Sequence, residues 1–317
     1  MKTIIGIDGG GTKTEFVLCD ETGFVKKRVL LGAGNPADIG LENACRLIKH
    51  GICGLLETED CQHAVIDGMF IGLSGGSVSD NTERIRSCFA QEFPLANFKN
   101  GSDAMNVISN GLEDDDGVIL IAGTGSVAFA RRGDEVWRAG GWGYLFDGAG
   151  GGYDLGQKAI QAALRELDGT GEKTLLSALL EKELGMNAGQ ALTRFYDGGK
   201  RFIASFAPLV FTAYKKKDAV AEQIIEETVS HWVTIINRAG KYVPHINRVA
   251  LAGSLFRQKD ILLPKLRKRI GREIEFILSD MPPVFGAIRE GLKLAGVEIS
   301  ETIKENFLQT YSGEVKP

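Results

Sequence analysis

The sequence predicts an α/β protein of two lobes, each built on a sheet whose first two strands form a glycine-rich hairpin. The length of 317 residues, 44% of them hydrophobic, corresponds to two domains of roughly 150 residues that can each bury a core. Glycine is unusually abundant, at 41 residues, and it gathers in clusters between apolar segments. Residues 4–20 and 118–131 share one plan: an apolar strand, a Gly-x-Gly-Thr/Ser turn and a second strand. This indicates a degenerate internal duplication, with one copy at the start of each lobe.

The first half of the chain alternates apolar, β-branched segments with amphipathic ones. Strands are expected where apolar segments are bounded by turn residues, and helices where apolar residues recur at helical spacing. The expected strands are residues 3–8, 15–20, 24–31 and 65–73, and the expected helices are residues 38–56, 81–89 and 104–110.

The second half is largely helical. The expected strands are residues 118–122, 127–131, 136–139, 248–252 and 274–278, and the expected helices are residues 156–167, 175–184, 219–240, 261–270 and 284–295. A charged turn at residues 113–117 separates the two halves. We therefore predict lobes of residues 1–113 and 114–317, and the helix at 284–295 is a candidate to pack back on the first lobe.

Composition excludes several classes of protein. The net charge is −4 and there is no strongly basic stretch, so nucleic acid is not an expected partner. Apolar runs are only as long as strands, and no signal-peptide core forms before Asp8, so neither a membrane partner nor export is expected. None of the five cysteines lies in a CxxC motif, which is typical of reduced thiols in a cytoplasmic protein.

Three familiar motifs nearly match and are rejected. Residues 6–13 have the glycine spacing of a P-loop, but Thr12 precedes Lys13 and a strand follows. Residues 123–128 match the relaxed dinucleotide fingerprint, but again a strand follows instead of a helix. Residues 72–76 match a serine nucleophile elbow, but nothing marks any of the four histidines as the partner base.

The two glycine turns suit a different phosphate site. Glycines let backbone N–H groups approach an anion, and the hydroxyl of Thr12 or Ser126 adds a donor. Two such turns facing each other across a cleft can hold a triphosphate, whereas ordinary tight hairpins explain one turn but not two matching ones. Asp8, at the end of the first strand, suits a Mg²⁺ shell beside phosphates or a turn-stabilising role. Lys13 either neutralises phosphate charge or points to solvent.

Other polar residues sit at loop tips. Asp103 is either a general base for a substrate hydroxyl or a helix N-cap. Trp142, Gly143 and Asp147 belong to a glycine-rich loop that is either a sugar site or a mobile surface loop. Asn35 alone is a turn residue.

Taken together, these motifs resemble the BadF/BadG/BcrA/BcrD-type ATPases, and within them the N-acetylglucosamine kinases of the actin/hexokinase superfamily. The resemblance covers nearly the whole chain, and its order and spacing carry it. The matching stretches are residues 8–14, 35, 72–76, 103–104, 123–126, 140–143, 147–148 and 251–254.

The resemblance implies a two-lobed actin-like, hexokinase-like fold with a ribonuclease H-like motif in each lobe and an interdomain cleft. It also implies ATP and Mg²⁺ as cofactors and Asp103 as the catalytic base, and Asp8 is the candidate metal residue. The implied ATP-binding residues are Gly10, Gly11, Thr12, Lys13, Gly123, Thr124, Gly125, Gly253 and Ser254. The implied sugar-binding residues are Asn35, Ser126, Trp142, Gly143 and Asp147.

The expected function is an ATP-dependent kinase that phosphorylates the 6-hydroxyl of an amino sugar, foremost N-acetylglucosamine. Glucosamine kinase, N-acetylmuramic acid kinase and a non-kinase ATPase or regulator of the same family are the alternatives. Gly148 stands where the family often has a glutamate, so the choice of sugar stays open. No cysteine follows Cys88, which argues against the iron–sulfur activators of the family. The oligomeric state stays open, with a homodimer as one option.

Overall fold

The chain divides into two compact units. In the computed structural model, which describes residues 1–57, 65–90, 97–244, 246–271 and 273–312, the first unit is Met1–Glu113 with Ser279–Pro317. The second unit is Asp114–Leu278. The first change of unit coincides with the charged turn. We expected residues 114–317 to form one lobe from which 284–295 packs back, but the whole stretch from Ser279 groups with the first unit.

The first unit contains a five-stranded mixed sheet in the order β3-β2-β1-β4-β5. Strands β1, β2 and β3 form an antiparallel meander, and β4 and β5 continue the sheet parallel to β1. The strands are β1 (Ile4–Gly9), β2 (Thr14–Cys19), β3 (Val25–Leu31), β4 (Gly68–Leu73) and β5 (Phe98–Ser102).

The second unit repeats this topology. Its sheet has the order β10-β9-β6-β7-β8, with β6, β7 and β8 as the meander and β9 and β10 parallel to β6. The strands are β6 (Gly117–Ala122), β7 (Ser126–Arg132), β8 (Glu135–Ala139), β9 (Arg248–Ala252) and β10 (Glu275–Leu278). The duplication seen in the sequence is therefore a duplication of the whole sheet. Each glycine turn follows the central strand, at the carboxyl edge where α/β proteins bind ligands.

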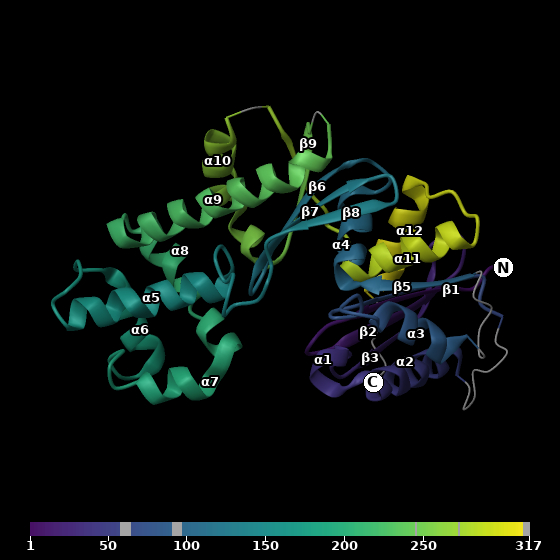
Figure 1. Ribbon diagram of the computed structural model, residues 1–317, viewed down its shortest axis with the longest axis horizontal. Coiled ribbons are helices and arrows are strands. Elements are labelled where there is room, and N and C mark those ends of the chain that lie inside the picture. Colours follow the sequence, from purple (N-terminus) through teal and green to yellow (C-terminus); the bar gives the residue numbers. More distant parts are fainter. Residues whose placement is uncertain (58–64, 91–96, 245, 272, 313–317) are drawn as a thin grey trace. The chain divides into compact units, whose positions relative to one another are not determined.

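Helices cover both faces of the first sheet. The helices are α1 (Pro36–Ile39), α2 (Leu41–Leu56), α3 (Asn81–Phe89), α4 (Asp103–Leu112), α11 (Pro283–Leu294) and α12 (Glu301–Tyr311). Alternation along β1 sends Ile5 and Ile7 into the core under α2, and Ile4 into the core formed with α11 and α12. Figure 1 shows α11 and α12, in yellow, beside this sheet although they come from the end of the chain.

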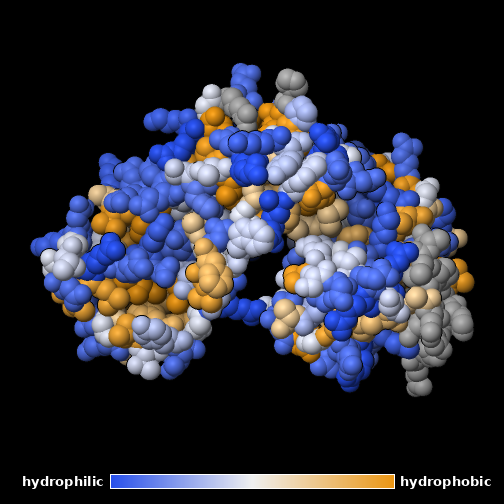
Figure 2. Space-filling model, in the orientation of Figure 1, coloured by the Kyte–Doolittle hydropathy of each residue, from blue (hydrophilic) through white to orange (hydrophobic). Residues whose placement is uncertain are grey.

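The second unit is mainly helical. Its elements are α5 (Gly152–Leu167), α6 (Leu175–Leu184), α7 (Leu192–Ala204), α8 (Ala207–Lys215), α9 (Ala219–Ala239), α10 (Lys259–Ile270) and the 3₁₀ helices η2 (Gly240–Tyr242) and η3 (Ser254–Gln258). Helix α9 packs along β6, β7 and β8, with Trp232 fully buried in the largest core cluster. Hydrophilic residues cover most of the visible face of both units (Figure 2). None of the helices within the described residues is long and apolar enough to cross a membrane.

Some elements differ from expectation. The helix predicted over 38–56 is two helices, because Gly40 adopts φ 80° and ψ 150° between them. Strand β5 and helices α7, α8 and α12 were not predicted. β5 has the sequence FKNGS, which lacks an alternating pattern, and it pairs with β4 through tertiary contacts. α7 contains adjacent glycines and a break at Gly199, which weaken its local signal.

Candidate functional site

Two carboxyl groups of the first unit meet at the carboxyl edge of its sheet. Asp8 lies near the end of β1 and pairs in register with Gly72 of β4, which in turn pairs with Gly101 of β5. Asp103 follows β5 directly and is the first residue of α4. The parallel strands therefore bring residues far apart in the sequence to one edge.

Asp8 is held by a buried amide. The Asn106 side chain, which is fully buried on α4, donates from Nδ2 to Asp8 Oδ1 at 2.7 Å. Burial raises the pKa of Asp8 to about 6, against the lowering effect of the Asn106 hydrogen bond, and the charges of Asp103 and Glu15 raise it further. The nearby Lys13 charge opposes this rise in pKa. Ionised Asp8 therefore lies in a locally negative environment that a cation would relieve.

Asp103 is not the N-cap of its helix. Ser102 occupies that position, and its hydroxyl accepts a hydrogen bond from the Ala104 N–H at 3.2 Å. The N-cap interpretation of Asp103 is therefore wrong. The Ser102 hydroxyl also donates to Asp103 Oδ1 at 3.1 Å. Burial raises the pKa of Asp103, and hydrogen bonds from Ser102 and Ser74 limit the rise. A raised pKa suits a carboxylate that must take up a proton near neutral pH.

The first glycine turn is exposed and connected to the Asn35 loop. Gly10 N–H donates to the Lys13 carbonyl at 2.9 Å, and Gly34 N–H donates to the Gly10 carbonyl at 3.0 Å. Gly11, Thr12 and Lys13 are exposed. The turn and the loop therefore lie together at the carboxyl edge of β1.

Asn35 is the N-cap of α1. Its Oδ1 accepts from Ala37 N–H at 3.0 Å, and its Nδ2 donates to Asp38 at 2.9 Å. Gly75, in the loop after β4, approaches Asn35 closely in the left-handed region, at φ 74°. Asn35 therefore has a structural task within the first unit.

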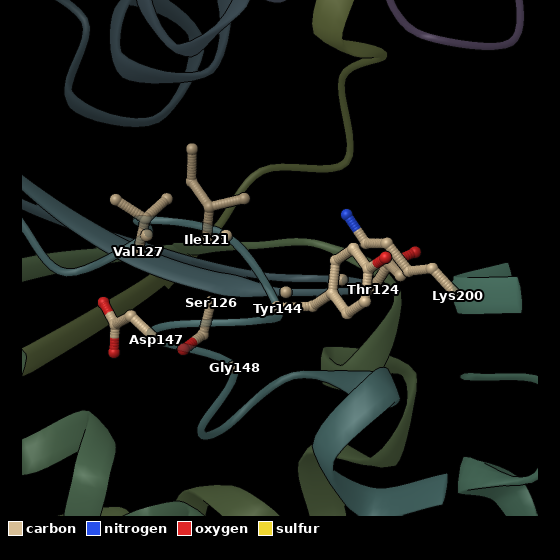
Figure 3. Close-up of a pocket in the computed structure, with 12 residues that line it drawn as sticks. Ile121, Thr124, Ser126, Val127, Tyr144, Asp147, Gly148 and Lys200 are labelled. Atoms are coloured by element: carbon tan, nitrogen blue, oxygen red, sulfur yellow. The ribbon is translucent and has the colours of Figure 1, made fainter. Parts of the chain in front are cut away.

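The second glycine turn lines a pocket of about 280 Å³ in the second unit (Figure 3). This is near the lower end of the range for small-molecule sites, roughly 300–1,000 Å³. The lining residues are Ile121, Gly123, Thr124, Gly125, Ser126, Val127, Gly141, Gly143, Tyr144, Asp147, Gly148 and Lys200. The structure thus brings the predicted phosphate turn together with three predicted sugar residues, Ser126, Gly143 and Asp147.

Helix α5 fixes this turn. The N–H groups of Gly152 and Tyr153, in its first turn, donate to the carbonyls of Gly123 and Thr124 at 2.7 and 2.9 Å. Ser126 Oγ donates to the Ala149 carbonyl at 2.7 Å. These hydrogen bonds hold the turn on its α5 side and leave its other side open to the pocket. A Cβ added at Gly125 would meet no atom within 4 Å.

The loop after β8 shapes the pocket through its glycines. Gly140, Gly141 and Gly143 have φ of 75°, 76° and 101°, which side chains other than glycine rarely adopt. Asp147, which lines the pocket, closes the loop: its N–H donates to the Gly143 carbonyl at 2.8 Å, and its Oδ2 accepts from the Trp142 N–H at 3.4 Å.

Trp142 lies outside this pocket lining. Its side chain is 68% exposed, and the Arg138 guanidinium stacks on its ring, 3.7 Å from the centroid. Tyr144 lines the pocket instead. The predicted packing of Trp142 on a sugar ring thus remains a prediction, and Tyr144 is an aromatic residue that sequence reasoning did not select.

A second pocket, of about 380 Å³, adjoins the same turn. It shares Gly123 and Thr124 with the first pocket and also contains Ser254, the residue predicted for the nucleotide end. The other lining residues are Gly152, Ala204, Ser205, Ala207, Pro208, Phe211, Leu255, Arg257 and Gln258. Gly253 has φ 105° and packs against the backbone of Ala122, so only glycine fits there. A pocket with a mixed apolar and polar lining, next to the turn predicted to bind phosphate, suits a nucleoside.

Sequence reasoning missed four residues of these sites: Ser74, Asn106, Tyr144 and Lys200. Asn106 lies three residues after Asp103, on the same face of a helix, so the spacing could have indicated it. Ser74 was visible in the rejected 72–76 motif. Lys200 lies on α7, where no element was expected, and no local signal pointed to it.

The chain is similar to known proteins over most of its length. The model of the BadF/BadG/BcrA/BcrD ATPase family matches residues 5–290. An N-acetylmuramic acid/N-acetylglucosamine kinase of Clostridium acetobutylicum is 29% identical over 303 residues, covering 91% of this chain and 97% of the relative. An N-acetyl-D-glucosamine kinase of Dictyostelium discoideum is 29% identical over 248 residues, covering 74% of this chain and 77% of the relative.

A solved structure supports the fold. A proposed N-acetylglucosamine kinase of Porphyromonas gingivalis superposes with a TM-score of 0.72 at 18% identity, covering 92% of this chain and 99% of that one. The α/β class and the actin/hexokinase-like fold predicted from the sequence are confirmed. With the family model matching nearly the whole chain, this protein belongs to the BadF/BadG/BcrA/BcrD ATPase family.

Proposed function

We propose that this protein is an ATP-dependent sugar kinase that phosphorylates the 6-hydroxyl of an amino sugar, foremost N-acetylglucosamine. The observation that carries the proposal is the pair of carboxyl groups Asp8 and Asp103 at one sheet edge, both with pKa raised by burial. Asp8 is suited to bind a cation beside the phosphates, and Asp103 is suited to act as a general base. The activities named for the relatives support the same reaction class.

Asp103 would act as the general base. As the sugar oxygen attacks the terminal phosphate, the hydroxyl proton passes to the Asp103 carboxylate. The Ser74 and Ser102 hydroxyls orient that carboxylate, and their hydrogen bonds lower its pKa against the rise caused by burial.

Asp8 would hold Mg²⁺ together with the nucleotide. Within the described residues, no group of three or more His, Cys, Asp or Glu side chains is arranged to bind a metal. Mg²⁺ at phosphates commonly needs only one or two carboxylates and keeps several waters, so a single Asp8 carboxylate fits. When bound, Mg²⁺ neutralises charge on the phosphates. The protein's part is to present an ionised Asp8, which Asn106 orients.

The remaining residues bind and orient the two substrates. We assign the ATP phosphates to Gly10, Gly11, Thr12, Lys13, Gly123, Thr124 and Gly125, and the nucleoside end to Gly253 and Ser254. We assign the sugar to Asn35, Ser126, Trp142, Gly143 and Asp147. Ser126 Oγ already donates to Ala149, so its lone pairs remain suited to accept from a sugar hydroxyl.

Gly148 bears on the choice of sugar. A Cβ at this position would lie 2.8 Å from the backbone carbonyl oxygen of Tyr144. The loop conformation of this chain therefore leaves no room for the glutamate that related kinases often carry. Glucosamine and N-acetylmuramic acid remain the alternative substrates.

A coupled assay for ADP release tests the proposal. The sugars to compare are N-acetylglucosamine, glucosamine, N-acetylmuramic acid and glucose, each with ATP and Mg²⁺. We expect ATP consumption only when an amino sugar is present. Saturable binding of sugar and ATP without turnover would instead identify a regulator, the alternative from another class. Light scattering on the same preparation distinguishes a monomer from a homodimer. A kinase that uses cellular ATP also fits a cytoplasmic location.

A further inference from the structure

We propose that Lys200 binds the terminal phosphate of ATP, which deepens the proposed function and rests on it. Lys200 is the single cationic side chain among the residues that line the first pocket, which it shares with Gly123, Thr124 and Gly125. In Figure 3 its side chain lies beside Thr124 and Tyr144, with Asp147 at the opposite end of the view. A positive charge next to a phosphate turn is the arrangement that phosphoryl transfer requires.

The backbone around Lys200 explains how it reaches the turn. Helix α7 is broken at Gly199, which has φ 62° and ψ −167°, so Lys200 begins a separate short helical segment. That segment is seated on α5, because Gly156 packs directly against the Ile203 carbonyl. The same α5 donates its first N–H groups to the carbonyls of Gly123 and Thr124. Lys200 and the phosphate turn are therefore attached to one helix.

The Lys200 ammonium is available to an anion. Lys200 is exposed, and the ion pairs within the described part of the chain do not include it. Its Nζ lies over the Tyr144 ring, 5.5 Å from the centroid. A compact, strongly hydrated ammonium on a flexible stem is well suited to bind phosphate as a point charge.

The two pockets indicate which phosphate Lys200 contacts. The nucleoside-sized pocket contains Gly123, Thr124 and Ser254 but not Lys200. Lys200 lines the other pocket, together with the candidate sugar residue Asp147. The Lys200 side of the turn is thus the side where the terminal phosphate would meet the sugar hydroxyl.

Nucleotide binding by a charge-removing variant tests the assignment. We would measure dissociation constants for ADP and for a non-hydrolysable ATP analogue, with Mg²⁺, in wild type, Lys200→Met and Lys200→Arg. Lys182→Met, an exposed lysine on α6 of the same unit, is the matched control. We expect Lys200→Met to raise the dissociation constant of the ATP analogue by roughly tenfold or more, as for a lost charged hydrogen bond. The dissociation constant of ADP should rise by less than about threefold. Lys200→Arg should restore most of the preference for the triphosphate, and Lys182→Met should match wild type.

Two outcomes would overturn the assignment. If Lys200→Met weakened the binding of ADP and of the ATP analogue equally, Lys200 would not distinguish the terminal phosphate. Unchanged nucleotide binding by Lys200→Met would mean that Lys200 does not contact the phosphates. If the same variant also lost affinity for N-acetylmuramic acid but not for N-acetylglucosamine, Lys200 would instead be a residue that binds a sugar carboxylate. Because these are binding measurements without turnover, failure of the kinase assay and failure of the Lys200 assignment are separate results.

Discussion

The side-chain amide of Asn106 donates to the carboxylate of Asp8 at 2.7 Å and to the carbonyl of Ile7 at 3.3 Å. Asn106 lies on the same face of α4 as Asp103, one turn further along the helix. One helix therefore sets the position of the candidate base relative to the candidate metal residue. Asp8 cannot shift without disturbing its hydrogen bond to the fully buried Asn106 side chain.

Replacing Asp103 by Asn should abolish most of the turnover. The amide keeps the shape of the carboxylate but cannot accept the hydroxyl proton, so we expect kcat to fall by roughly 10²–10⁴-fold with ATP affinity nearly unchanged. Steady-state kinetics and nucleotide titration measure the two quantities. Asp80→Asn, an exposed carboxylate whose side chain does not cap its helix, is the control and should behave as wild type. Turnover at the wild-type rate by Asp103→Asn would remove Asp103 from the mechanism.

Replacing Ser74 by Ala should move the pH profile. The Ser74 hydroxyl lowers the pKa of Asp103, so its loss raises that pKa further above the ordinary aspartate value. A base must be ionised to work, and the acid limb of kcat/KM should therefore move to higher pH. Ser77→Ala, at an exposed position of the same loop, should leave the limb in place. A limb that stays put or moves down in Ser74→Ala contradicts the role given to this hydrogen bond.

Replacing Gly125 by Val should remove ATP binding without unfolding the protein. Open space surrounds the position where its Cβ would lie, and the backbone is not in the left-handed region, so the fold tolerates a side chain. The valine then occupies the path of the phosphates. Thermal unfolding should show a near-wild-type midpoint, while isothermal titration should show ATP affinity reduced strongly in Gly125→Val and less in Gly125→Ala. A folded Gly125→Val protein with normal ATP affinity would mean that this turn is not a phosphate loop.

Replacing Asp147 by Ala should separate sugar binding from nucleotide binding. Asp147 lines the same pocket as Ser126, and loss of its carboxylate should remove hydrogen bonds to sugar hydroxyls. We expect the dissociation constant for the sugar to rise by roughly tenfold or more, with ATP affinity within about twofold of wild type. Asp134→Ala, in the exposed turn between β7 and β8, is the matched control. Equal loss of both ligands would point to collapse of the loop.

Two glycine-to-alanine changes in helices should have opposite signs. A Cβ at Gly286 on α11 would collide with the backbone carbonyl of Asn106, so Gly286→Ala forces α11 away from α4. We expect it to destabilise the protein by about 2 kcal/mol or more. A Cβ at Gly54 on α2 makes only an ordinary contact, 3.6 Å from Val29, so Gly54→Ala should stabilise by about 0.5–1 kcal/mol.

Urea unfolding followed by circular dichroism measures both changes. Stabilisation by Gly286→Ala would show that the α4–α11 contact is loose, and with it the support of Asn106.

The sequence by itself determined the α/β class, the two sheets and the two glycine turns. These depend on local physics: alternating β-branched residues extend the chain, and glycine clusters between them turn it. Asp8 and Asp103 were recognisable for the same reason, since each follows a short apolar stretch beside turn residues. Helices α3 and α6 were predictable from local sequence for a similar reason, because their apolar residues recur at helical spacing.

Only the tertiary structure decided the rest. β5 forms because β4 offers it a parallel partner, and α11 joins the first unit because Gly286 lets it approach α4 closely. Ser102, not Asp103, caps α4, a choice between adjacent polar residues that depends on backbone geometry. Asn106 and Lys200 reach their sites through contacts between segments far apart in the sequence. The helical spacing of Asn106 from Asp103 places the two on one face of α4, but its hydrogen bond to Asp8 and the position of Lys200 beside the turn depend on neighbours in space and leave no periodic pattern in the sequence.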